Sequence, residues 1–182
     1  MTVIAANAGR YPVPAQCGAL GAPRTHVAGD LTYVRAGGRW CYVCLLVDMG
    51  NREIVGCSCG RSKDAALVKA ALSNVEFPLT DIEVFHSDRG SEFCNAEIGA
   101  ALSAFGIERS VPGPGNPHDN AVVESVNHIL KRELVRGRRF VSEAELRAEL
   151  FDWVNRHDNF RIHSTLGYMS PVEFREAGFI LS

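Results

Sequence analysis

The first half of the chain contains short apolar runs separated by turn residues. DLTYV (30–34) and RWCYVCLLVD (39–48) lie on either side of the glycine pair Gly37 and Gly38, and EIVGCSC (53–59) follows the turn sequence MGNR. Runs rich in β-branched and aromatic residues, bounded by glycine-containing turns, are typical of strands joined as hairpins. We therefore expect three consecutive antiparallel strands.

The middle of the chain alternates between helical and strand patterns. DAALVKAAL (64–72), with Ser62 as its cap, and NAEIGAALSAF (95–105), which Gly106 ends, have apolar positions at helical spacing. DIEVF (81–85) and IERSV (107–111) are short apolar runs of strand length. Helices that alternate with strands favour parallel pairing, so these two runs should extend the sheet in parallel.

The last third is predicted to be helical. The loop PGPGNPHDN (112–120) is rich in helix breakers, and Asp119 or Asn120 can cap the helix AVVESVNHILKREL that follows. Another helix should begin at Ser142, where Glu145 completes a capping box. The whole pattern predicts an α/β domain with a five-stranded mixed sheet, three antiparallel strands followed by two parallel ones, flanked by helices.

Composition is that of one globular domain, with 182 residues, 46% hydrophobic and 22% charged. Residues 1–28 contain scattered glycine and proline, and we read them as an extended arm or linker remnant; 29–176 form the core and 177–182 a tail. No apolar stretch approaches the 18 or so residues of a membrane span, and the N-terminus has no signal-peptide layout. A cytoplasmic protein is expected.

The basic residues and the cysteines each allow two interpretations. The run Lys131, Arg132, Arg136, Arg138 and Arg139 forms either a phosphate-facing stripe or a solvated helix surface, although the net charge is only -2. The spacing CxxC then CxC at residues 41–59 resembles a zinc ribbon. Because an odd offset along a strand points Cys41 and Cys44 to opposite faces, buried free thiols are the preferred interpretation.

Three carboxylates on separate elements are the candidate chemistry. Asp30 lies early in the first strand, Asp88 ends the fourth in HSDRG, and Glu124 lies near the start of the helix after the glycine-rich loop. Functional crevices of α/β sheets lie beyond the carboxyl ends of strands, where Asp88 must be. Converging carboxylates repel one another unless cations are present, and Mg²⁺ prefers oxygen ligands completed by water and phosphate.

The helix that carries Glu124 presents further polar groups on one face. Asn127, His128 and Lys131 follow it at steps of three, four and seven residues. A carboxylate and a lysine two turns apart suit a metal at one end and a DNA phosphate about 10 Å away. An ordinary amphipathic surface helix would show the same spacing.

Several motifs in order resemble the integrase-type catalytic core of bacterial insertion-sequence transposases, the DDE group related to retroviral integrases. They are GDLTYV, VDMGNREIVG, HSDRGSEF, GNPHDNAVVES, KREL and RIHSTLGYMSPVEF, across residues 27–175. Asp88 and Glu124 are separated by 35 residues, as in this group. The resemblance implies a ribonuclease H-like fold and a catalytic and metal-binding triad of Asp30, Asp88 and Glu124.

The same resemblance implies a Mg²⁺- or Mn²⁺-dependent enzyme with two ions, which cleaves DNA and transfers strands. Its partners would be element ends and target DNA, with a homo-oligomer during synapsis. The resemblance implies DNA contacts from Lys131, Arg161 and His163, to which the helix face adds His128 and Asn127 and the basic run adds Arg132. It also implies active-site loops formed by His86, Ser87, Arg89, Gly90, Asn116, Asp119 and Asn120. The alternatives are a nuclease of the same fold that only hydrolyses, or a catalytically silent DNA-binding remnant.

The chain departs from the family pattern in three ways. Val27 stands where tryptophan is common, and His157 and Asp158 replace a Tyr-Asn pair, so we expect packing near Asp30 and contacts from the last helix to differ from the family pattern. Residues 1–28 are too short and glycine-rich to supply the helix-turn-helix segments that complete members carry. Large apolar residues, including Trp40, Trp153, Phe85 and Phe105, are expected in the core.

Overall fold

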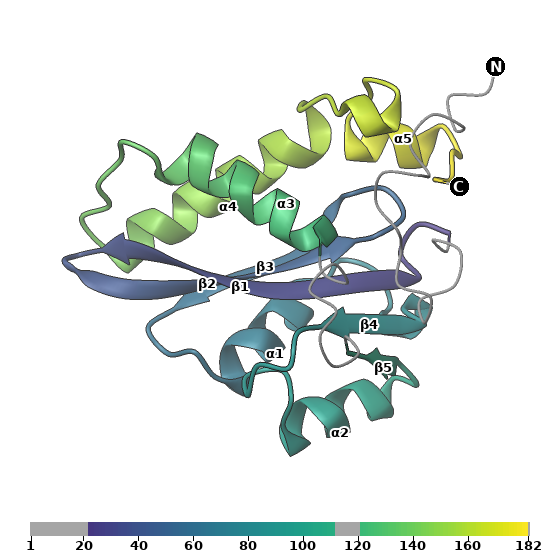
Figure 1. Ribbon diagram of the computed structural model, residues 1–182, viewed down its shortest axis with the longest axis horizontal. Helices are drawn as coiled ribbons and strands as arrows, with labels where there is room; N and C mark the ends of the chain where they lie inside the picture. The colour runs from purple at the N-terminus through teal and green to yellow at the C-terminus, as the bar shows by residue number, and fades with distance from the viewer. Residues whose placement is uncertain (1–21, 112–120, 182) are drawn as a thin grey trace.

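A five-stranded mixed sheet organises the protein. The computed structural model describes residues 22–111 and 121–181. The strand order is β3-β2-β1-β4-β5, with β1 (His26–Ala36), β2 (Arg39–Asp48) and β3 (Ile54–Gly60) antiparallel, and β4 (Val84–Ser87) and β5 (Glu108–Ser110) parallel to β1 (Figure 1). This confirms the predicted sheet.

Helices cover both faces of the sheet. α1 (Ala65–Ser73) and α2 (Ala96–Ala104) lie on one side, and α3 (Ala121–Leu130) and α4 (Glu143–Asn159) on the other, with α5 (Pro171–Glu176) beyond them (Figure 1). Single turns occur at η1 (Leu79–Asp81), η3 (Lys131–Val135, a π-helical turn) and η4 (Ser164–Leu166). In the described parts of the chain, no helix is both long enough and apolar enough to cross a membrane.

Alternation along the central strands divides the core into two clusters. Val43 and Leu45 of β2 pack toward α3 and α4, whereas Cys44 and Leu46 pack toward α1 and α2. Cys41 and Cys44 accordingly lie on opposite faces, and Cys41, Cys44, Cys57 and Cys59 are buried free thiols, as the strand periodicity predicts. Cys94 is exposed, and Cys17 lies outside the described residues.

Several element ends differ from the prediction. α1 is capped by Asp64, whose side chain accepts a hydrogen bond from the Leu67 N–H, and not by Ser62, because the helix begins two residues later than that cap requires. β1 begins at His26, inside the range assigned to an extended arm. At α4, Ser142 is the N-cap as predicted, and the Glu145 carboxylate accepts from the Val141 N–H.

Two of the four large apolar residues expected in the core are at the surface. Trp153 and Phe85 are buried, but Trp40 is 50% exposed and Phe105 is 44% exposed. Phe105 is the C-cap residue of α2, where the chain turns away from the core. Trp40 lies near the start of β2, on the sheet face that α1 and α2 cover only farther along the strand.

His157 and Asp158, the departures from the family pattern, form a buried polar pair at the end of α4. The His157 Nδ1 and Asp158 Oδ1 atoms are 2.8 Å apart, and Asp158 also accepts a hydrogen bond from the Ile54 N–H at 3.0 Å. Burial lowers the pKa of His157 to about 4 and raises the pKa of Asp158 to about 8. Because burial opposes both charges, we treat the pair as neutral and structural; it joins α4 to β3.

Candidate active site

The register of the sheet brings Asp30 and Asp88 to adjacent positions. β4 pairs with β1 only from His26 to Gly29, and the last pair is Gly29 with Ser87. Asp30 and Asp88 are the next residues on their respective chains. Neighbouring strands lie about 4.8 Å apart, so the two carboxylates emerge side by side where the β1–β4 ladder stops.

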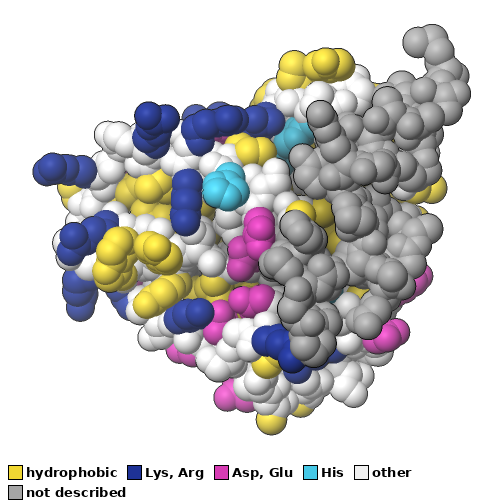
Figure 2. All heavy atoms as spheres, viewed as in Figure 1, with side chains coloured by type: hydrophobic (Ala, Val, Ile, Leu, Met, Phe, Trp, Pro, Cys, Tyr) yellow, Lys and Arg dark blue, Asp and Glu magenta, His cyan; other side chains and the backbone are white. Residues whose placement is uncertain are grey.

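Glu124 reaches the same region from α3. Burial raises the pKa of Asp30, and the charges of Asp88 and Glu124 raise it further. The Glu124 side chain is exposed and lies in the first turn of its helix. Figure 2 shows acidic side chains gathered near the middle of this face, with Lys and Arg side chains to one side. Three segments distant in sequence therefore place their carboxylates close enough to interact.

Asn127 holds the central carboxylate in place. Its Nδ2 donates a hydrogen bond to Asp30 Oδ2 at 2.8 Å, and its side chain is buried. This hydrogen bond lowers the pKa of Asp30, which opposes part of the effect of burial. Asn127 was predicted to contact DNA. Its burial differs from that prediction, because the amide is used inside the protein to orient Asp30.

The loop after β4 fixes Asp88. The Gly90 N–H donates to Asp88 Oδ1 at 2.8 Å, and the Ser87 hydroxyl donates to the Asp88 carbonyl at 3.1 Å. His86 is buried, with Nδ1 at 3.0 Å from the Ser110 hydroxyl, whereas Arg89 is exposed. Of the residues predicted to shape the site, Asn116, Asp119 and Asn120 lie outside the described residues.

An ion pair between the buried carboxylate of Glu92 and the half-exposed side chain of Lys63 was not predicted from the sequence. Glu92 is 3% exposed, and its Oε1 lies 3.0 Å from the Lys63 ammonium. The hydrogen bond with Glu92 raises the pKa of Lys63, and the charge of Asp88 adds to the effect. A Cβ atom on Gly90 would lie only 2.5 Å from Glu92 Oε1. The only sequence signal was an acidic residue directly before the apolar Phe93 in HSDRGSEF.

The donor chemistry of the three carboxylates fits hard divalent cations. In residues 22–111 and 121–181, no three His, Cys, Asp or Glu side chains are close enough together to hold one ion as they stand. Mg²⁺ requires only one or two protein carboxylates, because water and substrate phosphate complete its shell. The charges of Asp88 and Glu124 raise the pKa of Asp30, and a bound cation would offset this repulsion among the carboxylates.

The exposed face of α3 continues into basic residues. His128, Lys131 and Arg132 are exposed, and Lys131 begins the π-helical turn η3. Arg132 Nη2 lies 3.7 Å from Glu133 Oε1. A π-helical turn often occurs at functional sites. His128 and Lys131 follow Glu124 along the helix at the predicted spacing and are exposed, and Arg132 adjoins Lys131.

The other two predicted DNA contacts are in different settings. Arg161 donates to Glu133 Oε1 at 3.0 Å and lines an open groove of about 570 Å³ together with Arg138, Arg156 and Phe160. His163 is 9% exposed, and its ring lies 4.9 Å from that of His157. Burial lowers the pKa of His163 to about 4. This burial differs from the prediction of a DNA-contacting surface.

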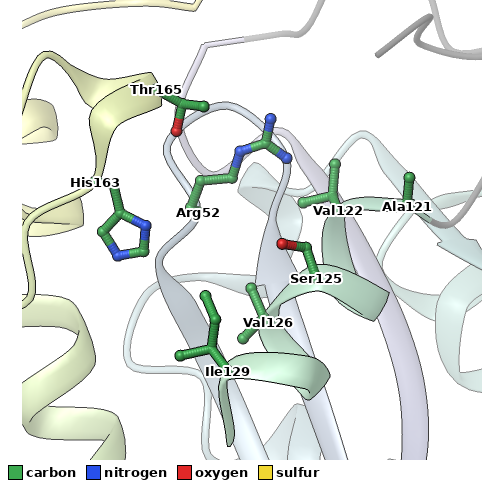
Figure 3. Close-up of a pocket in the computed structure, with 8 residues that line it drawn as sticks. All are labelled: Arg52, Ala121, Val122, Ser125, Val126, Ile129, His163 and Thr165. Carbon is green, nitrogen blue, oxygen red and sulfur yellow. The ribbon is translucent and has the colours of Figure 1, made fainter. Parts of the chain in front are cut away.

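A small pocket lies on another face of α3, away from Glu124. It encloses about 90 Å³ between the helix, the β2–β3 turn and η4 (Figure 3). The side chains in Figure 3 come from those three segments: Arg52, Ala121, Val122, Ser125, Val126, Ile129, His163 and Thr165. The carboxylates are not among its lining residues, so it is separate from the candidate active site.

Comparison with protein families agrees with this geometry. Residues 21–117 match a family model described as integrase core domain, and residues 105–171 match a second model with the same description. The chain is 33% identical over 157 residues to the transposase InsF for insertion sequence IS3A of Escherichia coli (strain K12), covering 84% of this chain and 54% of that protein.

A second relative is the transposase for insertion sequence element IS904 of Lactococcus lactis, 32% identical over 159 residues, with 85% of this chain and 62% of that protein covered. The chain thus spans 54% of the length of the first relative and 62% of the second.

Solved structures show the same fold. The catalytic core domain of BIV integrase superposes with a TM-score of 0.65 at 18% identity, covering 85% of this chain and 95% of that one. The HTLV-2 integrase catalytic core domain in complex with magnesium gives 0.64 at 14% identity, covering 85% and 97%. The fold is therefore ribonuclease H-like, as predicted. Together these matches show that the chain belongs to the integrase core domain family and is similar to insertion-sequence transposases.

Proposed function

We propose that this chain is a transposase catalytic core that cleaves DNA phosphodiester bonds and transfers the ends to a target, with Asp30, Asp88 and Glu124 as its catalytic carboxylates. The main support is the sheet register, which ends at the Gly29–Ser87 pair and so places Asp30 next to Asp88; the charges of Asp88 and Glu124 both raise the pKa of Asp30, after the larger effect of burial. Family membership supports the same reaction class. Only the catalytic step is assigned to this chain, because it spans about half the length of the relatives it matches.

Two Mg²⁺ or Mn²⁺ ions are the cofactors we propose, held by Asp30 together with Asp88 at one position and with Glu124 at the other. Bound there, they would supply an activated water or 3'-hydroxyl and stabilise the leaving oxygen. A related integrase core was solved in complex with magnesium. Asn127 would keep Asp30 oriented, and the Gly90 N–H would hold one oxygen of Asp88 so that its other oxygen faces the substrate.

DNA is the partner that the basic surface fits. We assign phosphate contacts to Lys131, His128 and Arg132, which are exposed beyond Glu124 on the same surface. Arg161 is a further phosphate contact at the edge of the open groove, where Glu133 holds its guanidinium. A relative of this fold was solved as an intasome. Element ends and target DNA are thus the proposed substrates, with a multimer assembled during synapsis.

The test is strand transfer by the purified chain with a precleaved DNA end and Mg²⁺ or Mn²⁺. Asp88→Asn should abolish cleavage and joining, and it should retain or improve DNA binding, because it removes a negative charge next to phosphates. Asp152→Asn removes the same charge at an exposed position on another helix, α4, and serves as the control. Hydrolysis without joining would indicate a nuclease, and binding without either reaction a silent remnant.

A further inference from the structure

Two exposed aromatic rings and two cations form a connected surface beside the candidate active site. The Tyr33 and Trp40 side chains are 57% and 50% exposed, and their rings meet edge to face with centroids 5.1 Å apart. The Arg35 guanidinium lies 5.1 Å from the Trp40 ring, and the Lys131 ammonium lies 5.0 Å from the Tyr33 ring. We call these four residues the aromatic patch.

The sheet register explains why these side chains meet. Arg35 is directly opposite Trp40, and Tyr33 is opposite Tyr42 in the β1–β2 ladder, so Tyr33 and Trp40 are diagonal neighbours on one face. Tyr42 packs against the core under α1, but the strand positions beyond it are no longer covered. The patch is therefore where the sheet extends past its helical layer.

Lys131 connects the patch to the catalytic helix. β4 stops pairing with β1 after Gly29, which leaves room for Lys131, from the end of α3, to reach Tyr33. Tyr33 is three residues from Asp30 along β1, about 10 Å at the rise of a strand. Figure 2 shows hydrophobic side chains with Lys and Arg beside them, on the same face as the acidic side chains.

The chemistry of this patch suits a nucleotide whose base is unpaired. A nucleobase stacks on Tyr and Trp rings regardless of sequence, and Arg and Lys beside them neutralise the phosphates on either side. A paired base inside a duplex has both faces covered by its neighbours. We propose that the aromatic patch binds an unpaired base of the DNA substrate, within a few nucleotides of the reacting phosphodiester; this rests on the proposed DNA-cleaving function.

A second copy of this chain is the competing occupant of an exposed aromatic surface. The charges favour DNA, since two like-charged identical patches would repel each other, whereas Arg35 and Lys131 attract a polyanion. Arg35 and Lys131 already lie over the faces of the two rings. A base that stacks on a ring would displace the cation, which could then bind the phosphates on either side of that base. Unpaired DNA thus satisfies both features of the patch.

The binding test uses the full chain in EDTA, where metal-dependent catalysis is absent. The protein is titrated with a labelled single strand of about 12 nucleotides and with the matching duplex, following anisotropy and tryptophan emission. Trp153 is buried, so quenching by the single strand would report Trp40. Trp40→Ala and Tyr33→Ala should each weaken single-strand binding about 5- to 140-fold, and Trp40→Phe should retain most of it. Phe105→Ala removes another exposed aromatic side chain, at the end of α2, and is the control.

The outcomes separate this proposal from the catalytic one. Single-strand affinities of Trp40→Ala and Tyr33→Ala that stay within twofold of wild type would overturn the aromatic patch, even if strand transfer with Mg²⁺ succeeds. Tryptophan emission that follows protein concentration and ignores DNA would also overturn it, in favour of an interface between copies. If single strands quench the tryptophan emission but the protein does not carry out strand transfer, the aromatic patch is supported and the proposed catalytic function is refuted.

Discussion

Gly90 provides a test of how the loop that carries Asp88 is built. Its backbone is not in the left-handed region, where glycine is favoured, so the requirement for glycine is one of space. A Cβ at this position would lie 2.5 Å from Glu92 Oε1, almost 1 Å closer than an ordinary contact, which begins at about 3.4 Å. Because Glu92 is 3% exposed and paired with Lys63, its carboxylate has little freedom to move away.

Gly90→Ala should therefore destabilise the protein by about 1 to 3 kcal/mol, the usual cost of overpacking a filled site. In a Glu92→Ala background the same change should be neutral, or stabilising by about 0.4 to 1 kcal/mol, because alanine restricts the unfolded chain more than glycine does. The coupling between the two positions would then be about 1 to 4 kcal/mol.

Urea unfolding of wild type, both single variants and the double variant, followed by circular dichroism, measures this coupling. Equal costs of Gly90→Ala in the two backgrounds, within about 0.5 kcal/mol, would refute the idea that Glu92 occupies the space. Since the Gly90 N–H donates to Asp88, metal-dependent cleavage should fall in Gly90→Ala and recover in part in the double variant.

The remaining predictions concern stability, measured by urea unfolding. Gly56→Ala would place a Cβ 2.5 Å from the Ala71 carbonyl oxygen and should cost about 1 to 3 kcal/mol, whereas Gly99→Ala, in an open part of α2, should stabilise by about 0.8 to 1 kcal/mol. At pH 7, Asp158→Asn should cost less than about 1 kcal/mol because the carboxyl is already neutral, but Asp158→Ala should cost about 2 to 4 kcal/mol by leaving two buried partners unsatisfied. His157 is neutral in the folded protein down to about pH 4, so between pH 6.5 and 4 only the unfolded chain takes up its proton. The contribution of His157 to the free energy of unfolding is therefore lost as pH falls, by up to about 1.4 kcal/mol per pH unit, and His157→Gln should make the dependence of stability on pH correspondingly shallower. Asp158 has the opposite effect, because its contribution is lost as pH rises from about 4 to 8.

The sheet and its helices could be predicted because the pattern of apolar positions changes clearly between strand and helix periods. The opposite facing of Cys41 and Cys44 follows from strand geometry alone, and the buried thiols agree with it. Boundaries were less predictable. Ser62 and Asp64 are both good caps by residue type, and only the packing of α1 against β3 decides where that helix begins.

The candidate site was predictable in its acidic residues but not in the groups that support them. Asp88 and Glu124 stand at a spacing characteristic of a known family, whereas Glu92 and Lys63 are paired by tertiary structure and have no sequence signal of comparable strength. Asn127 shares a helix face with exposed residues, yet its side chain is buried because the amide donates a hydrogen bond to Asp30. Trp40 is of a residue type usually found in the core, but it is exposed because α1 does not extend over that part of the sheet.

The brevity of β4 has a consequence for how the site can arise and be lost. Only four rungs join it to β1, and the two aspartates stand at the first rung that is missing. If β4 continued to pair with β1 for two more residues, both aspartates would lie within a continuous sheet, and their carboxylates would be crowded between the paired strands. Insertions or deletions just after Ser87 should therefore abolish catalytic activity far more readily than they unfold the protein.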